Sequence, residues 1–300
     1  MANQVKTVFL LGVLSVLFVA FGGLFGEQYL WMFGLMAIAM NFGAYFFSDK
    51  IVLAMHGARE VGRGERTGLR HMVEDLAMRA GLPTPRIFVI DSPQPNAFAT
   101  GRSPQHGAIA FTSGILNSMS ERELRGVAAH ELGHIKNRDI LITTIAATIA
   151  SAIAYLANMA QWAAMFGGQR RDDDGDSSPM KALVLALVAP LAATVLQLAI
   201  SRSREYLADE SSARTTGDPE GLALALGHLE SAAAVTEPAA ASPALAALFI
   251  VNPFSGVGGT IANLFSTHPP IAERIARLRT MAGRSDWRSG VISPRRAAFG

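Results

Sequence analysis

Four long apolar blocks constrain the fold of this chain more than any other feature of its sequence. They cover roughly residues 5–25, 30–47, 140–166 and 182–200, and each is about as long as the 17 to 25 residues that a membrane-spanning helix needs. The chain is 50% hydrophobic and only 17% charged, whereas a soluble domain is nearer a quarter charged. The blocks therefore predict a mostly α-helical integral membrane protein with four transmembrane helices.

Alternatives remain open for two of these assignments. Lys6 followed by a run of apolar residues is also typical of a cleaved signal peptide, but the second block follows almost at once, which favours an uncleaved hairpin. The last two blocks could instead form a buried helical hairpin of a large soluble core. Their length and lack of charge argue against that alternative.

Basic residues predict the orientation of the chain in the membrane. The polar stretch after the second block carries Lys50, Arg59, Arg63, Arg66, Arg70, Arg79 and Arg86, whereas the link before that block has no Lys or Arg. The positive-inside rule then places the N-terminus and both polar regions in the cytoplasm. The acidic link between the third and fourth blocks should face the other side.

The blocks divide the chain into four units. These are a first transmembrane hairpin over 1–47, a cytoplasmic region over 48–139, a second transmembrane hairpin over 140–200 and a cytoplasmic region over 201–300. Periodicity and turn residues predict helices over 68–80, 219–233 and 270–281, and strands over 86–91, 96–100 and 108–112, the last two joined as a hairpin. The segment 234–265, rich in Ala, Pro, Gly and Ser, is expected to be a long mobile connection.

The pentapeptide His130-Glu131-Leu132-Gly133-His134 is the main chemical signal. Residues four apart lie on one face of a helix, so both imidazoles can point at one metal ion. Glu131 is then projected beside the metal, where a carboxylate can take a proton from water. Ser120 and Glu123 form a predicted capping box, which indicates a helix starting near Ser120 independently of the motif. The alternative is a pair of buried histidines in an ordinary helix.

A catalytic zinc needs a third protein ligand and an open position. The chain has no cysteine, so the third ligand must be a histidine or an acid. Glu205 is the best candidate, because two apolar blocks separate it from the histidines and return it to the same side of the membrane. Asp209, one turn later, would accept the N–H of a ligand histidine. The alternative is a pair of solvated acids partnered by Arg202 or Arg204.

Four motifs occur in a fixed order between the apolar blocks. They are Asn96-Ala-Phe-Ala-Thr-Gly101, the histidine pentapeptide, Ser201-Arg-Ser-Arg-Glu205-Tyr-Leu-Ala-Asp209 and Ser266-Thr-His-Pro-Pro270. Together they resemble the HtpX family of membrane-bound zinc metalloproteases and, more distantly, the CAAX prenyl proteases. The resemblance covers the whole chain.

The resemblance implies a gluzincin-type α+β zinc peptidase domain with a small β-sheet. It implies one Zn²⁺ per chain, held by His130, His134 and Glu205, with Glu131 as the base. It also implies a multi-pass protein of the bacterial inner membrane, with its active site facing the cytoplasm. Its role would be quality control of membrane proteins, beside other membrane proteases.

Two further segments are candidates for contact with a substrate. Asn96, Ala97, Phe98 and Ala99 could form a strand edge on which an extended peptide lies, and the alternative is an ordinary hairpin strand. His268, held before Pro269 and Pro270, could donate a hydrogen bond to the oxyanion of the reacting carbonyl. The alternative for His268 is a residue that only caps the helix that follows.

These features predict a membrane-bound zinc endopeptidase, and the resemblance implies that it hydrolyses misfolded or damaged membrane proteins. The expected partners are unfolded or membrane-protein polypeptides and the lipid bilayer. A narrow-specificity processing protease of the CAAX type is the alternative enzyme, and a membrane scaffold or chaperone without turnover is the alternative of another class. The intact Glu131 argues against the scaffold. A net charge of only +2 and the lack of a Gly-rich phosphate loop give no indication of nucleic acid binding.

Overall fold

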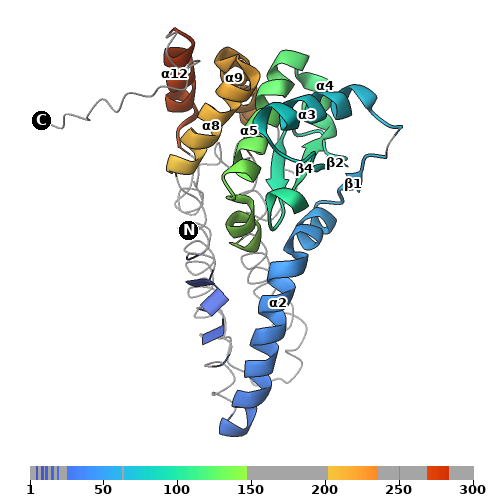
Figure 1. Cartoon of the computed structure of the whole chain (residues 1–300), viewed down its shortest axis with the longest axis vertical. Helices are drawn as coiled ribbons and strands as arrows, with labels where there is room; N and C mark the ends of the chain where they lie inside the picture. The colour runs from blue at the N-terminus through green and yellow to red at the C-terminus, as the bar shows by residue number, and fades with distance from the viewer. Residues whose placement is uncertain are drawn as a thin grey trace, which may run out of the picture.

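The computed structural model describes residues 26–62, 64–146, 202–235, 250 and 269–283, with single residues between 5 and 19. Its helices are η1 (Glu27–Tyr29), α2 (Leu30–Met55), α3 (Thr67–Ala80), η2 (Pro104–His106), α4 (Ser113–Ser118), α5 (Glu121–Lys136), α8 (Arg202–Thr216), α9 (Pro219–Val235) and α12 (Ile271–Ala282). Its strands are β1 (Arg59–Glu60), β2 (Arg86–Ile90), β3 (Ala97–Thr100) and β4 (Ala108–Thr112). Figure 1 shows the sheet and the shorter helices gathered at one end, with α2 extending away from them.

The four strands form one mixed sheet in the order β1-β2-β4-β3. The predicted hairpin is confirmed, because β3 pairs with β4 in antiparallel fashion from Ala97 opposite Phe111 to Thr100 opposite Ala108. β4 also lies parallel to β2, and β3 is left at one edge. Gly101 makes the turn after β3 with a φ of 136°, and a Cβ at this position would lie 2.3 Å from the carbonyl oxygen of His106, so only glycine fits there.

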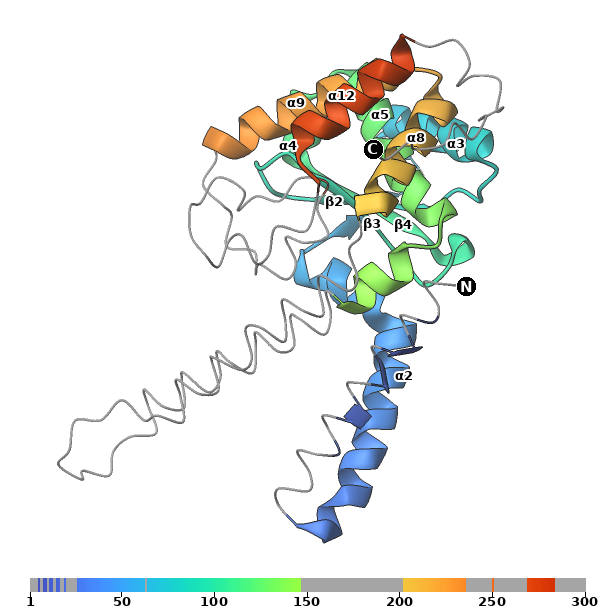
Figure 2. The same cartoon turned by 90° about the vertical axis from the view of Figure 1, so that its left-hand side faces the viewer.

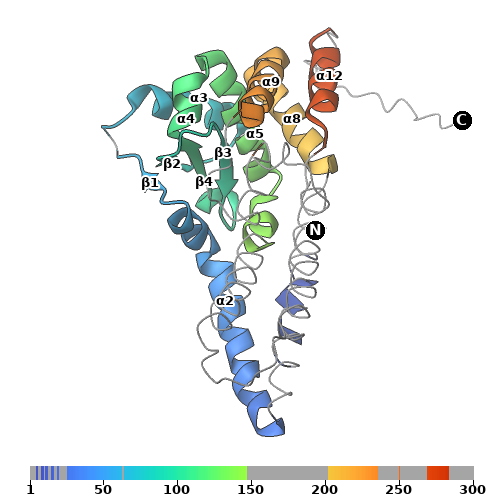
Figure 3. The ribbon, with the colours of Figure 1, turned by 180° about the vertical axis from the view of Figure 1, so that it is seen from behind.

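The sheet is covered on both faces. On one face Ile109 and Phe111 pack in the main core with Val127 and Leu132 of α5, and all four are fully buried. α5 in turn contacts α3, α8 and α9, and Figure 3 shows α8, α9 and α12 beyond it on the side away from the sheet. On the other face the end of α2 packs against Phe88, Phe98 and Ala110. The metal-binding helix is thus held between the sheet and the C-terminal helices.

The start of α5 follows the predicted capping box. The amide of Glu123 donates to Ser120 Oγ at 3.3 Å, and the amide of Ser120 donates to Glu123 Oε2 at 2.9 Å. α5 ends at Lys136, the chain turns through Arg138 in a left-handed conformation, and residues 140–146 are helical again. A turn therefore separates the histidine helix from the third apolar block.

Among the described residues, one helical stretch, Glu27–Met55, is long and apolar enough to cross a membrane by its length and composition. Its apolar window has a mean hydropathy of 1.5, and only 11% of it is buried. α2 continues past the predicted boundary at residue 47, and Asp49 on its last turns pairs with Arg86 of β2 at 2.9 Å. This ion pair joins α2 to the domain that contains the sheet, and Figure 2 shows α2 projecting from that domain.

The first apolar block lies beside α2 at one described point. Asn41 of α2 donates from Nδ2 to Ser15 Oγ at 2.7 Å, which places the two predicted spans of the first hairpin side by side. Most of the first and third blocks and all of the fourth lie outside the described residues, as does most of the connection 234–265.

Candidate metal centre

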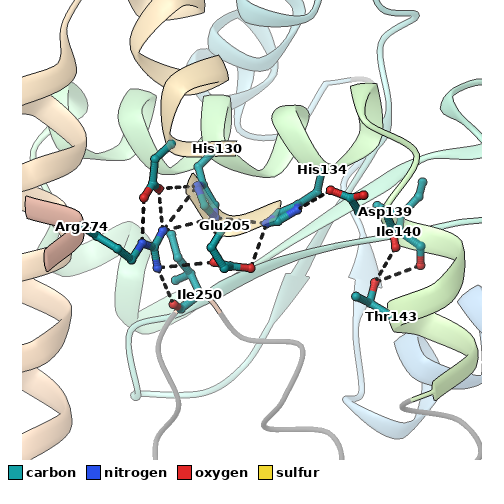
Figure 4. A network of polar contacts seen from close by, with 9 residues as sticks. His130, His134, Asp139, Ile140, Thr143, Glu205, Ile250 and Arg274 are labelled. Atoms are coloured by element: carbon teal, nitrogen blue, oxygen red, sulfur yellow. Dashed lines mark hydrogen bonds and ion pairs between the residues drawn. The ribbon is translucent and has the colours of Figure 1, made fainter. Parts of the chain in front are cut away.

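α5 and α8 lie side by side in antiparallel order and bring the three candidate ligands together. Ser212 Oγ donates to the Gly126 carbonyl at 2.8 Å towards one end of the pair. Towards the other end Gly133 faces Ala208, where a Cβ on Gly133 would lie 3.1 Å from the Cα of Ala208. This close approach brings the first turn of α8 next to the last turns of α5. The side chains of His130, His134 and Glu205 meet there (Figure 4), and one potential ligand atom from each lies within 4.8 Å of the other two.

The three side chains fit a zinc ion. The Nε2 atoms of His130 and His134 lie 3.2 Å apart, and the Glu205 oxygens lie 3.7 Å from His130 Nε2 and 3.6 Å from His134 Nε2. Tetrahedral zinc bonds of about 2.0–2.2 Å would place such ligand atoms roughly 3.3–3.6 Å from each other. Two imidazoles and one carboxylate form a donor set typical of catalytic zinc, with a fourth position left for water or substrate.

Each candidate ligand histidine has an aspartate at its other ring nitrogen. His130 Nδ1 lies 3.0 Å from Asp209 Oδ1, and His134 Nδ1 lies 3.4 Å from Asp139 Oδ2. A histidine that donates from Nδ1 keeps the Nε2 lone pair for a metal, so both contacts favour the metal-binding tautomer. Asp209 therefore lies at the ring nitrogen that the sequence analysis assigned to it.

A buried arginine from α12 completes this polar network. The Arg274 side chain is fully buried and donates from Nε to Asp209 Oδ2 at 2.9 Å and from Nη2 to Asp209 Oδ1 at 2.7 Å. Its Nη1 lies 3.5 Å from Glu205 Oε2 and donates to the carbonyl of Ile250 at 3.3 Å. Figure 4 shows the guanidinium between the two acids of α8 and His130.

The network shifts the pKa values of the metal-free centre. Burial raises the pKa of Glu131, against the attraction of His130 and His134. Burial lowers the pKa of His134, but Asp139, Glu205 and Glu131 outweigh it and raise that pKa to about 9. Burial opposes ionisation of Asp209, but the charge of Arg274 and the hydrogen bonds from Arg274 and His130 still hold its pKa below the usual range.

Glu131 lies between the ligand histidines and the edge of the sheet. Its side chain is buried, and the backbone of Ala99 in β3 lies close enough to oppose the rise of its pKa. The neighbouring edge group, the carbonyl of Ala97, accepts from the Ile250 amide at 3.3 Å. Asn96 is turned inward, and its Oδ1 accepts from the amide of Ala97 at 3.0 Å. The predicted base and the predicted substrate strand thus lie against each other.

Two residues of the network were missed by sequence reasoning, and one predicted residue lies outside the description. Arg274 occupies a position in the apolar stripe of α12 with Ile271, Leu278 and Met281, so a charge on the buried face was the available signal. Asp139 follows the end of α5, and no spacing marks it. His268 falls outside the described residues, so its role stays a prediction.

Comparisons with known proteins match this chain along most of its length. The model of Peptidase family M48 matches residues 64–282. The chain is 56% identical over 283 residues to a protease HtpX homolog of Thermodesulfovibrio yellowstonii, covering 94% of this chain and 99% of the relative. It is 54% identical to a protease HtpX homolog of a Sulfurihydrogenibium species, covering 94% and 97% of the two chains. A crystal structure of S. mikatae Ste24p is 22% identical, with a TM-score of 0.48 over 92% of this chain and 65% of that one.

The donor set of the site and these relatives define the protein as a zinc metallopeptidase, with zinc held by His130, His134 and Glu205. The predicted cofactor and the predicted class of enzyme are confirmed. The chain belongs to peptidase family M48, together with the proteases named HtpX homologs.

Proposed function

We propose that this metallopeptidase is a membrane-bound endopeptidase that cuts misfolded or damaged membrane proteins. The observation that carries the proposal is the packing of α5 against the edge strand β3, which brings the buried Glu131 close to the backbone of Ala99. A peptide that takes the place of Ile250, whose amide donates to the Ala97 carbonyl at this edge, would pass the metal ligands and the base at once. Main-chain hydrogen bonds do not depend on the side chains of the bound peptide. This mode of binding therefore suits substrates that are recognised because they are unfolded and not by their sequence.

The residues of the site divide the work of hydrolysis. When bound, zinc supplies a Lewis acid that polarises the scissile carbonyl and activates water. Glu131 takes the proton from the attacking water and passes it to the leaving amine, and the burial that raises its pKa suits a group that must gain and lose a proton. His268 is proposed as a hydrogen-bond donor to the developing oxyanion. The edge of β3 positions the substrate peptide. Its capacity for main-chain pairing is seen at Ala97, whose carbonyl accepts a hydrogen bond from the Ile250 amide.

The membrane assignment has its own support. α2 leaves large apolar side chains uncovered, with Trp31 85% and Ile38 68% exposed, which suits a helix in lipid. With the basic residues that follow it, the helix favours a multi-pass protein of the bacterial inner membrane with a cytoplasmic active site. Membrane-protein segments, and other membrane proteases acting on the same material, are the partners proposed on this basis.

The hydrolytic proposal is tested on purified full-length protein in detergent. Zinc content and cleavage of an unfolded protein such as casein are measured for the wild type and for Glu131→Gln. The variant should keep about one zinc per chain and lose roughly 10² to 10⁴ of the rate, the usual size of general-base assistance. Undiminished cleavage by the variant would rule out Glu131 as the base.

The breadth of substrates separates this proposal from its alternatives. Many cuts in several unrelated unfolded proteins are expected. A single cut in one prenylated or precursor peptide would favour a narrow processing protease, and zinc binding without any turnover would favour a scaffold.

The orientation is tested with a reporter fused near Gly175, in the acidic link. A signal from the non-cytoplasmic side is expected. A cytoplasmic signal from a normally inserted chain would mean that the third and fourth blocks do not cross the bilayer.

A further inference from the structure

We propose that Arg274 is a positioning residue of the metal centre, which sets the geometry of the zinc ligands through Asp209 and Glu205 without touching the substrate. The inference deepens the proposed function, on whose hydrolytic mechanism its kinetic readout rests. Its metal-binding readouts stand without that mechanism. Arg274 reaches the site from α12, which contributes no metal ligand among the described residues.

The first step of the argument is the paired contact with Asp209. Both carboxylate oxygens of Asp209 are held, at 2.9 and 2.7 Å, by two nitrogens of the same guanidinium. This fork fixes the plane of the carboxylate as well as its distance. Because the same Oδ1 lies 3.0 Å from His130 Nδ1, fixing that plane fixes the rotation of the His130 ring. The direction of His130 Nε2 towards the metal position follows.

The second step is the contact with the third ligand. Nη1 of Arg274 lies 3.5 Å from Glu205 Oε2, so one cation lies against both acids of the first turns of α8. The side chains of Asp209 and Glu205 are each at least 93% buried, and two buried carboxylates repel each other unless a positive charge lies between them. Arg274 therefore holds Glu205 in place even before a metal ion does.

The third step excludes a direct part in catalysis. The Arg274 side chain has no exposed surface, and its Nη1 is also engaged by the Ile250 carbonyl. A group whose three nitrogens are already engaged by Asp209 and by the Ile250 carbonyl acts on the reaction through the residues that it holds. A lysine could restore the charge but not the two parallel hydrogen bonds, so the arginine fork is the specific requirement.

The test compares Arg274→Met and Arg274→Lys with the matched control Arg279→Met in full-length protein. Arg279 lies on the same helix, is exposed, and pairs with Glu220 on α9 at 3.3 Å. Zinc affinity is measured by chelator competition, and the ligand field by the visible absorption of the cobalt-substituted protein. Arg274→Met should lose about 10- to 100-fold in zinc affinity or kcat, the usual effect of removing a group that orients a metal ligand.

The pattern across the variants decides the matter. A change in the cobalt spectrum and in kcat, with KM kept, is expected for Arg274→Met; partial recovery is expected for Arg274→Lys, and wild-type behaviour for Arg279→Met. In an Asp209→Asn background, Arg274→Met should cost much less, because the path through Asp209 is already lost. A folded Arg274→Met protein with wild-type zinc affinity and cobalt spectrum overturns the proposal. If that variant does not fold, an unaltered spectrum in Arg274→Lys overturns it.

These readouts keep two failures apart. If zinc affinity and the spectrum change as expected while no variant, wild type included, cuts casein, the substrate proposal fails and the positioning role stands. If the wild type cuts casein and Arg274→Met changes none of the metal readouts, the positioning role fails alone.

Discussion

At the scale of single residues, the two zinc-binding histidines have different surroundings although they are one helical turn apart. The His130 side chain is 1% exposed and lies 3.0 Å from an aspartate that Arg274 also holds. The His134 side chain is 16% exposed, and its contact with Asp139 is longer, at 3.4 Å. His134 is therefore the ligand at which protons and solvent compete with the metal.

That competition predicts a pH dependence of zinc binding. The pKa of His134 in the metal-free protein is raised to about 9, against the effect of burial, by Asp139, Glu205 and Glu131. Zinc binds the neutral ring and must displace this proton. Through His134 alone, zinc affinity should therefore increase by up to about tenfold for each pH unit as the pH is raised towards 9. Above pH 9 it should level off. Chelator competition at a series of pH values measures this.

The control for this titration is Asp139→Asn. Removing the aspartate removes one cause of the raised pKa of His134, so the levelling should move to lower pH. A zinc affinity that does not vary between neutral pH and pH 9 would contradict the assignment.

Sequence reasoning reached the residues of the site that form local patterns. His130, His134 and Glu131 follow from helical spacing, and Glu205 follows from counting apolar blocks and from the lack of cysteine. Arg274 and Asp139 could not be reached in this way. Their contacts depend on how α12 packs and on a left-handed turn at Arg138, and neither has a signature within a few residues of sequence.

At the scale of elements, glycines set how closely α5 approaches its neighbours. A Cβ on Gly126 would lie 2.7 Å from the backbone nitrogen of Leu222 in α9, and a Cβ on Gly133 would lie 3.1 Å from the Cα of Ala208 in α8. The first distance forces backbone to move, and the second requires a shift of a few tenths of an ångström. Only the second contact is next to the metal ligands.

The two glycine variants should therefore differ in what they lose. Gly126→Ala should lower the free energy of unfolding by about 1–3 kcal/mol, the usual cost of overpacking, with zinc affinity little changed. Gly133→Ala should weaken zinc binding, because it moves α8 and Glu205 away from the histidines. Thermal unfolding and chelator competition on both variants measure the contrast.

Gly68→Ala is the matched control. Gly68 is exposed in α3, and a Cβ there meets nothing within 4 Å, so the gain in helix propensity should leave stability unchanged or raised by up to about 1 kcal/mol. Loss of zinc in Gly126→Ala, but not in Gly133→Ala, would contradict this assignment. It would mean that the contact of Gly126 with α9, and not that of Gly133 with α8, sets the spacing of the ligands.

The capping box gives a second prediction for α5. Ser120→Ala removes the acceptor of the Glu123 amide and should cost about 1 kcal/mol of stability. The metal ligands lie beyond the first turn, so zinc affinity should stay near that of the wild type. A measured loss of zinc larger than the loss of stability would mean that the start of α5 is coupled to the site.

The elements themselves were largely predictable, and their arrangement was not. The capping box at Ser120 and the Asp218-Pro219 pair before α9 are local signals, and the structure has a helix at each of them. β2 pairs in parallel with β4, with Arg86 opposite Ala108, although β3 lies between these two strands in the sequence. No local pattern distinguishes the observed order β1-β2-β4-β3 from an order in which strands adjacent in sequence are also adjacent in the sheet. The observed order depends on which strands α5 covers.

At the scale of the whole molecule, zinc joins parts of the chain that two predicted spans separate. A ligand that binds only the folded state stabilises it by RT ln(1 + [L]/Kd), or about 4 kcal/mol when free zinc is a thousandfold above Kd. Removing zinc with a chelator should therefore lower the unfolding temperature of the full chain. Differential scanning fluorimetry in detergent, with zinc added back, measures the shift.

Glu205→Ala provides the comparison for this experiment. Without its third ligand the protein should unfold near the temperature of the chelated wild type, with little further response to chelator. An unfolding temperature that responds to chelator equally in both proteins would place the stabilising zinc elsewhere.

The position of Arg274 has a consequence for the timing of biosynthesis. It lies 144 residues after His130 and 65 after Asp209. At about 5–20 residues per second, a ribosome makes His130 roughly 7 to 30 seconds before it makes Arg274. Asp209 is made only 65 residues before Arg274, so for roughly 3 to 13 seconds of that interval it lacks the cation that holds it. The hydrolytic centre of a newly made chain is therefore complete only after α12 has been made and has docked.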